Sequence, residues 1–129
     1  MTDTVADFFT RIRNGYQAGL REMVMPGSKF KEALGKVLVE KGFLEEVKVE
    51  KEKGKSRLKV RLKYESKRPA ITRIVMISKP GRRVYTKMRK MLVVRGGRGV
   101  TIVSTAKGVM EDKEACELKL GGEVIGQVW

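Results

Sequence analysis

Apolar residues recur every three or four positions near the start of the chain, which is the spacing of an amphipathic helix. Residues 3–18 follow this pattern. The apolar face of this segment carries Val5, Phe8, Phe9, Ile12 and Tyr16. A second helix is predicted over residues 29–41, because Ser28 can cap its first turn and Gly42 lies just past its end.

The pattern then changes to an alternation of apolar and polar residues, which is typical of strands with one buried face. Residues 45–52 and 56–64 alternate in this way on either side of a turn, and residues 22–26 form a short extended piece between the helices. The turn ends in Gly54-Lys55-Ser56 but lacks the earlier glycine of a phosphate-binding loop, since Val49 stands there. We therefore predict an α-β-α-β-β order and a hairpin turn.

The second half of the chain is predicted to be mainly antiparallel β-structure with one short helix. Strands are expected over residues 71–77, 84–85, 100–103 and 123–129, and a helix over 111–118. Residues 86–94 fit either a helix or a strand, and 96–99 form a basic glycine turn. A change of composition at residues 66–69 predicts a linker, so we expect an α+β protein of two small lobes, 1–65 and 70–129.

Positive charge is concentrated in the second half of the chain. The sequence has 29 Lys and Arg residues against 15 Asp and Glu residues, a formal net charge of +14. Residues 67–110 contain 12 basic residues and no acidic one, whereas solvated surfaces usually mix both signs. This segment therefore predicts a contact surface for a polyanion, with nucleic acid favoured over an anionic membrane.

Several classes of function lack the residues that they need. With one cysteine, Cys116, and no histidine, neither an internal disulfide nor a zinc site is expected. No apolar run of about 18 residues is present and the N-terminus is polar, so neither a membrane span nor a signal peptide is expected. We expect a cytoplasmic protein without a cofactor.

A loop rich in hydroxyls after the strand at 100–103 is the main candidate site. Ser104 and Thr105 carry hydroxyls that both donate and accept hydrogen bonds. Lys107 offers a cation for phosphate, and Gly108 allows a sharp turn or a close approach to a ligand. This chemistry suits sugar hydroxyls, phosphates and base edges, although ordinary turns have a similar composition.

Other residues of this half are open to more than one interpretation. Tyr85 follows an arginine pair and either stacks on an unpaired base or lies in the core. Glu123 supports Lys107 from behind, accepts hydrogen bonds from a base or ribose, or is simply solvated at a strand end. Ser104 and Lys107 have the Ser-x-x-Lys spacing of some acyl-enzymes, but the companion motifs are missing, so no catalytic residue is assigned.

A series of short motifs runs in a fixed order along nearly the whole chain. The first are Thr2-Asp3-x-x-Ala6-Asp7, Thr10-Arg11-Ile12-Arg13-Asn14, Ser28-Lys29-x-Lys31 and Gly42-Phe43. The later ones are Ile77-Ser78-Lys79-Pro80-Gly81-x-Arg83-Val84-Tyr85, Ser104-Thr105-x-Lys107-Gly108-Val109-Met110, Glu114-Ala115, Gly121-Gly122-Glu123 and Val128-Trp129. Together they resemble the family of bacterial small-ribosomal-subunit protein eight.

The resemblance implies a non-enzymatic constituent of the small ribosomal subunit that binds the central domain of its rRNA directly and helps to assemble the platform. Family members meet the RNA through residues that correspond here to Ser104, Thr105, Lys107, Gly108, Tyr85 and Glu123. RNA contacts are also expected from the basic segment, at Lys79, Pro80, Gly81, Arg82, Arg83, Lys87 and Arg98, where the cationic side chains would meet phosphates. Further contacts to rRNA are expected from Arg11, Arg13, Asn14, Lys29 and Lys31.

The resemblance also implies partners besides rRNA. These are neighbouring small-subunit proteins, with protein five foremost, and a similar structure in the mRNA of the protein's own operon, whose translation it would repress. Four departures from the family pattern bear on the RNA contacts. Ala106 stands where a second serine is usual, Thr4 replaces a proline, and Gly96 and Arg98 replace Asn and Leu. The rival functions are a free-standing DNA-binding regulator and, more distantly, an acyl-transferring enzyme.

Overall fold

The computed structural model describes residues 2–78, 85–86 and 99–129, which fall into two compact units. The N-terminal unit comprises residues 4–71, and the C-terminal unit comprises the described part of residues 72–129 together with residues 2–3. Helices with a small sheet in the first and an antiparallel sheet with a short helix in the second confirm the predicted α+β fold of two lobes.

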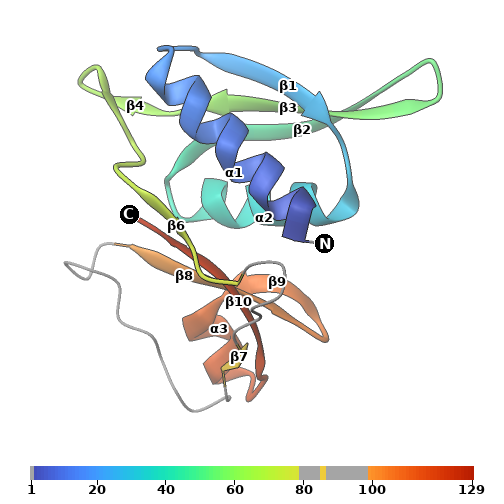
Figure 1. The fold of residues 1–129 in the computed structure, drawn as a ribbon, viewed down its shortest axis with the longest axis vertical. Helices are drawn as coiled ribbons and strands as arrows, with labels where there is room; N and C mark the ends of the chain where they lie inside the picture. The colour runs from blue at the N-terminus through green and yellow to red at the C-terminus, as the bar shows by residue number, and fades with distance from the viewer. Residues whose placement is uncertain (1, 79–84, 87–98) are drawn as a thin grey trace. The chain divides into compact units, whose positions relative to one another are not determined.

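Two helices cover one face of a three-stranded antiparallel sheet in the N-terminal unit (Figure 1). The helices are α1 (Thr2–Gln17) and α2 (Lys29–Glu40), and the strands are β1 (Glu22–Pro26), β2 (Leu44–Glu52) and β3 (Lys55–Leu62), in the spatial order β1-β3-β2. The predicted α-β-α-β-β order is correct. Alternate residues of β3 point into the core, where Leu58, Val60 and Leu62 are buried, so the opposite face of the sheet carries the charged residues.

The ends of α2 lie where the sequence predicts them. The Ser28 side chain accepts a hydrogen bond from the Lys31 backbone N–H at 3.1 Å and thus caps the first turn. Gly42 adopts a left-handed φ of 83° just past the last turn, a conformation that favours glycine.

The segment predicted as a linker forms a small hairpin in the structure. Strand β4 (Tyr64–Glu65) pairs with β5 (Arg68–Pro69), and Ser66 and Lys67 at the turn both have positive φ angles. Two left-handed residues in succession are the geometry of a type I′ hairpin turn. The N-terminal unit continues to Ile71, and the predicted domain boundaries stay a prediction.

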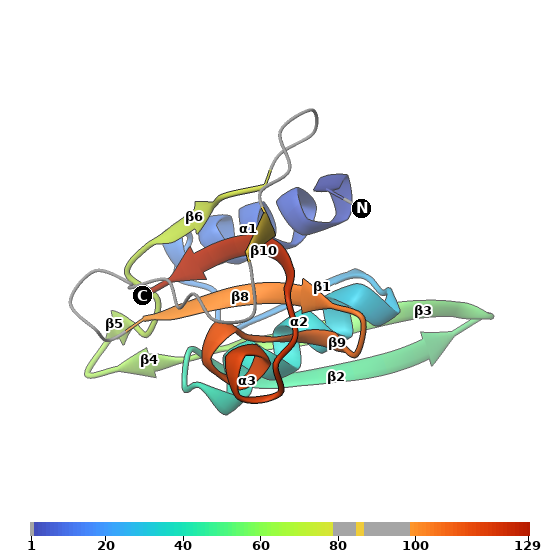
Figure 2. The same ribbon diagram turned by 90° about the horizontal axis from the view of Figure 1, so that it is seen from below.

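The C-terminal unit is built on an antiparallel sheet in the order β6-β10-β8-β9, with β7 also paired to β10. The strands are β6 (Ile74–Met76), β7 (Tyr85–Thr86), β8 (Val100–Thr105), β9 (Gly108–Glu111) and β10 (Gly122–Val128). Helix α3 (Asp112–Glu117) packs on β8 and β9 (Figure 2). The core beneath the helix contains Val103, Met110, Ala115 and Val124. Strand β9 was not predicted, because only Val109 and Met110 are apolar in it. Most of the predicted segments 86–94 and 96–99 lie outside the described residues.

Tyr16 joins helix α1 to the backbone just before β2 and just after β3, at the end of the sheet where Leu44 pairs with Leu62. Its hydroxyl donates to the Phe43 carbonyl at 2.9 Å and accepts from the Lys63 backbone N–H at 3.2 Å. Burial raises the pKa of Tyr16 to about 12. The hydroxyl therefore satisfies two backbone groups in the interior, and its loss would leave both without this partner.

We expect Tyr16→Phe, which removes only that hydroxyl, to lower the free energy of unfolding by about 1–2 kcal/mol at neutral pH. The raised pKa also favours the protonated phenol in the folded state, so its contribution is present below pH 10 and is lost as the pH rises towards 12. Urea denaturation at several alkaline pH values checks this: the gap between wild type and variant should narrow above pH 10. A gap that stays constant would contradict the assigned role.

Candidate nucleic-acid interface

The register of the C-terminal sheet brings three of the predicted site residues into one row. Glu123 of β10 pairs with Tyr85 of β7 on one side and with Ser104 of β8 on the other. Ser104 in turn pairs with Val109 of β9. Directly paired residues point to the same face of a sheet, with Cβ atoms roughly 5 Å apart. We call Tyr85, Glu123, Ser104 and Val109 the cross-strand row.

The cross-strand row lies on the face of the sheet opposite helix α3. Val103 and Val124 precede and follow Ser104 and Glu123 in sequence, and both are buried in the core beneath α3. Because successive side chains in a strand alternate between faces, the row must point away from this core. Tyr85 is 69% exposed, so the interpretation that it lies in the core is wrong.

Ser104 and Thr105 differ in the use of their hydroxyls. Thr105 Oγ1 donates to the Gly108 carbonyl at 2.9 Å and accepts from the Lys107 backbone N–H at 3.1 Å, so it holds the β8–β9 turn together. Within the part of the chain that the structure describes, the half-buried Ser104 hydroxyl makes no hydrogen bond. The Ser104 hydroxyl is thus available to a ligand, whereas much of the bonding capacity of Thr105 serves the turn.

The β8–β9 turn presents its cation to solvent beside the row. Lys107 and Ala106 are exposed at the tip, and Gly108 completes the turn at a φ of 117°, in the region that L-residues rarely adopt. A substitution at Gly108 would therefore strain the turn although its Cβ would meet no neighbour. The sequence alone identified this turn but gave no means of separating the structural hydroxyl from the available one.

The second glycine of Gly121-Gly122-Glu123 has a steric role that the sequence did not show. A Cβ built on Gly122 would overlap the carbonyl oxygen of Ser104 and lie 3.1 Å from Cγ2 of Thr105. Strands β10 and β8 can therefore approach as they do only with a glycine at this position. Gly122 thereby places Glu123 beside Ser104.

Most predicted contact residues of the N-terminal unit lie at its surface, but Lys31 does not. Arg13, Asn14 and Lys29 are exposed, and the half-buried Arg11 forms an ion pair with Asp7 at 2.9 Å. Lys31 is only 5% exposed, and its ammonium group lies 2.6 Å from the Asp7 carboxylate and 3.2 Å from the Pro26 carbonyl. The prediction that Lys31 contacts RNA therefore gives way to a structural role.

Seven predicted RNA-contact residues lie outside the described residues: Lys79, Pro80, Gly81, Arg82, Arg83, Lys87 and Arg98. Among the residues that are described, no cluster of three or more His, Cys, Asp or Glu side chains could hold a metal ion. No helix in that part of the chain is long and apolar enough to cross a membrane.

Comparison with known proteins decides the family. A family model described as ribosomal protein S8 matches residues 3–129. The chain belongs to this family. Similar curated relatives are small ribosomal subunit proteins uS8. The one from Azoarcus sp. strain BH72 is 49% identical over 97% of this chain and 95% of the relative. Those from Hydrogenovibrio crunogenus and Nitratidesulfovibrio vulgaris strain DP4 are 46% and 41% identical, over 97% and 100% of this chain and 95% and 99% of theirs.

Membership of the S8 family confirms the resemblance drawn from the motifs. The chain is a bacterial small-subunit ribosomal protein, which acts in the cytoplasm, and not an enzyme. The Ser-x-x-Lys spacing of Ser104 and Lys107 therefore does not mark an acyl-enzyme, and the free-standing DNA-binding regulator is set aside as well. Binding to rRNA and a part in translation follow from the family.

Proposed function

We propose that this protein binds the central domain of small-subunit rRNA directly and helps to assemble the platform of the subunit. The observation that supports it most is the cross-strand row, in which an exposed aromatic ring, a carboxylate and an available hydroxyl lie side by side. The lysine of the β8–β9 turn adds a cation at the end of strand β8. This set can contact a base, a ribose and a phosphate of one RNA segment.

The chemistry of the row favours an irregular RNA structure over a regular helix. The major groove of A-form RNA is too narrow for side chains, so sequence is recognised at bulges and loops where bases are unstacked. Tyr85 can stack on such a base, and Ser104 can exchange hydrogen bonds with a ribose hydroxyl or a base edge. Glu123, as a carboxylate, accepts from a base amino group or a 2′-hydroxyl, and is disfavoured against phosphate.

Phosphate contacts supply affinity without sequence preference in this scheme. The acid-free segment 67–110 attracts RNA over long range and contacts its backbone. Lys107 is an exposed cation of this segment beside the row, and Arg13, Asn14 and Lys29 of the N-terminal unit make further contacts to rRNA. Specificity and general attraction are thus assigned to different side chains, which makes them separable by substitution.

We expect Ser104→Ala to weaken binding to a central-domain rRNA fragment by about 1–3 kcal/mol, the scale of a lost hydrogen bond in a desolvated site. Its affinity for tRNA should stay unchanged. Lys107→Gln is the contrasting variant: it should weaken binding to both RNAs alike and lower the slope of log affinity against log salt by roughly 0.7–0.9. Thr105→Ser keeps the hydroxyl that holds the turn and should bind as wild type does.

The measurement is a titration of the full-length protein against the labelled fragment in moderate salt with excess tRNA. Wild-type binding that survives the competitor supports specific recognition. Binding that tRNA abolishes would mean that net charge alone drives it, and the proposed function would fall. Equal weakening for the fragment and tRNA in Ser104→Ala would refute the assignment of specificity to the row.

The proposal includes the two finer partners that the family resemblance implies. The same row would bind a similarly shaped structure in the mRNA of the protein's own operon and repress its translation. A neighbouring small-subunit protein, with protein five foremost, would contact the bound protein. Cell-free translation of the operon mRNA should be inhibited by wild type and not by Ser104→Ala; inhibition by both would argue against repression through this surface.

A further inference from the structure

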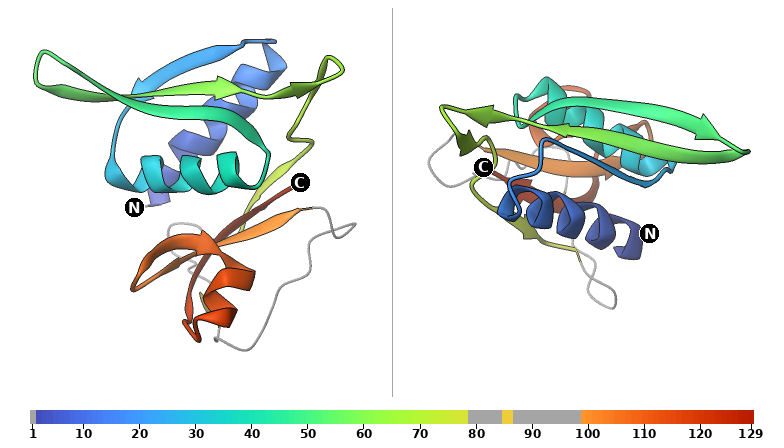
Figure 3. Two further views of the ribbon diagram at one scale, coloured as in Figure 1. Left: turned by 180° about the vertical axis from the view of Figure 1, so that it is seen from behind. Right: turned by 90° about the horizontal axis from the view of Figure 1, so that it is seen from above.

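The β2–β3 hairpin of the N-terminal unit extends past its neighbouring strand as an arm. The register ends at Pro26 of β1 opposite Arg57 of β3, so the residues nearer the turn have no third strand beside them. Figure 3 shows the green hairpin running on beyond the end of the blue strand β1. Residues 51–57, which we call the hairpin arm, are all exposed and contain four basic residues and one acidic residue.

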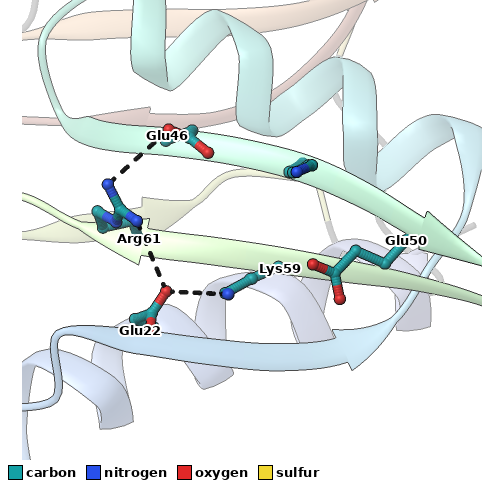
Figure 4. Close-up of a pocket in the computed structure, with 6 residues that line it drawn as sticks. Glu22, Glu46, Glu50, Lys59 and Arg61 are labelled. Carbon is teal, nitrogen blue, oxygen red and sulfur yellow. Dashed lines mark ion pairs between the residues drawn. The ribbon is translucent and has the colours of Figure 1, made fainter.

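The rest of the outer face of this sheet balances its own charges. Glu22 lies 3.3 Å from Lys59 and 3.9 Å from Arg61, and Arg61 lies 3.9 Å from Glu46 (Figure 4). Such a mixed surface offers little to a polyanion. Its carboxylates would repel phosphates as strongly as its cations attract them.

The hairpin arm differs from that face because most of its charge is uncompensated. Lys51, Lys53 and Lys55 form no ion pair with the described part of the chain. Arg57 is paired with Glu52 at 3.9 Å, but both side chains are more than half exposed, so the pair contributes little and Arg57 can exchange partners. The arm thus presents an excess of positive charge.

A shallow hollow of about 310 Å³ lies where the arm joins the edge strand β1. Its lining consists of Val24, Met25 and Pro26 from β1 and Lys55, Ser56 and Arg57 from β3. Val24 is 49% exposed, an unusual degree for a large apolar side chain of a strand. The hollow therefore combines an apolar floor with a hydroxyl and two cations, and its volume is at the lower end of the range of small-molecule sites.

The edge of β1 argues for a nucleotide over a protein segment as the occupant. A peptide would add to this edge by backbone pairing, but Pro26 has no N–H to donate. The Leu62 backbone N–H donates to the Arg21 carbonyl, and the Gly27 N–H donates to the Ser56 carbonyl. The backbone N–H and C=O groups of the odd-numbered residues of β1 therefore point toward β3. On the open edge, only the backbone N–H groups of Glu22 and Val24 remain as donors. Two donors are too few to hold an added peptide strand.

We infer that the hollow and the hairpin arm bind an unpaired RNA nucleotide, with its base on Val24 and Pro26 and its phosphate at Lys55 and Arg57. The inference rests on the proposed function in taking RNA as the partner, but it adds a second site in the other unit. Base faces are apolar and stack on guanidinium planes, which suits Arg57 beside the exposed valine. With no aromatic side chain in the lining, the site accepts any base.

The test is a titration of full-length protein, with its valine methyl groups labelled for NMR, against a short oligouridylate. We expect the Val24 methyl signals to shift. Lys55→Gln/Arg57→Gln should weaken oligouridylate binding about tenfold and lower the salt slope by roughly 1.4, since each phosphate contact to a single strand contributes roughly 0.7. The matched control Lys36→Gln/Lys48→Gln removes the same charge elsewhere in this unit and should change neither by more than about twofold.

Two further variants separate the apolar floor from the charge. Val24→Thr keeps the shape of the side chain but adds a hydroxyl, so it should weaken binding two- to fivefold without changing the salt slope. Glu52→Gln removes the competing carboxylate beside Arg57 and should strengthen binding two- to threefold. The inference would be overturned if Lys55→Gln/Arg57→Gln and its control Lys36→Gln/Lys48→Gln lost the same affinity for oligouridylate. It would also be overturned if the Val24 signals did not shift.

The outcome is separable from that of the proposed function. Ser104→Ala should leave the Val24 shifts intact, because Ser104 belongs to the other unit. Failure of the central-domain fragment to bind, with Val24 shifts still present, would count against the proposed function alone. Specific binding of that fragment without any Val24 shift would count against the hollow alone.

Discussion

Gly122→Ala is expected to lower the stability of the C-terminal unit by about 3–4 kcal/mol, although it adds a single methyl group. The new Cβ would overlap the carbonyl oxygen of Ser104 and approach its carbonyl carbon to 3.0 Å. These are backbone atoms, which no change of rotamer can move aside. The overlap can be removed only if β10 and β8 move apart where Gly122 pairs with Thr105.

The same separation should abolish specific RNA recognition, because Glu123 is the next residue and its pairing with Ser104 defines the cross-strand row. Hydrogen exchange measured by mass spectrometry tests the effect on each unit. Exchange in β8 and β10 should become faster in Gly122→Ala, while β2 and β3 keep their protection. Binding of the central-domain rRNA fragment should fall to the level of tRNA.

Gly54→Asn provides the control for replacing a glycine. Gly54 lies at the β2–β3 turn with a φ of 77°, where a Cβ meets no neighbour and asparagine tolerates the left-handed conformation. This variant should stay within about 0.5 kcal/mol of wild type. Wild-type protection of β8 and β10 in Gly122→Ala would show that the strands accommodate the methyl group, and the steric argument would then fail.

The features that could be predicted from the sequence are those set by residues close together in the chain. Helix α2 is an example, since its cap at Ser28 and its stop at Gly42 are local signals. The β2–β3 hairpin is another, since the alternation of two adjacent segments determines its buried face. Strand β9 was missed because two apolar residues do not establish a period, and only pairing with β8 makes it a strand.

The arrangement of the candidate site depended on contacts between distant residues, which no local pattern encodes. Glu123 lies between Tyr85 and Ser104 because of strand order, and that order was not predicted. Val109 joined the row for the same reason. Lys31 was assigned to the RNA surface by the family resemblance, and the sequence around it does not reveal that its partner Asp7 comes from another helix.

Asp7→Ala is expected to cost about 2–3 kcal/mol of unfolding free energy, more than the loss of its partner in Lys31→Met. Removing Asp7 leaves the Lys31 ammonium, with a side chain 7% exposed, in contact with only the Pro26 carbonyl among the described residues. Removing Lys31 instead leaves a carboxylate that is 38% exposed and still paired with Arg11. That exposure also keeps the cost below the roughly 3–5 kcal/mol of breaking a fully buried pair.

The pH dependence and a double variant identify the ion pair as the source of this cost. Hydrogen bonds from Lys31 and Arg11 lower the pKa of Asp7 from its usual value of 3.8, so the stability that Asp7 contributes is present above that pH and is lost as the pH falls below it. In urea denaturation, the gap between wild type and Asp7→Ala should therefore close in acid. Asp7→Ala/Lys31→Met should be more stable than Asp7→Ala alone, since it removes the stranded cation. Additive losses in the double variant would show that the two side chains act independently, and that burial of Lys31 does not depend on Asp7.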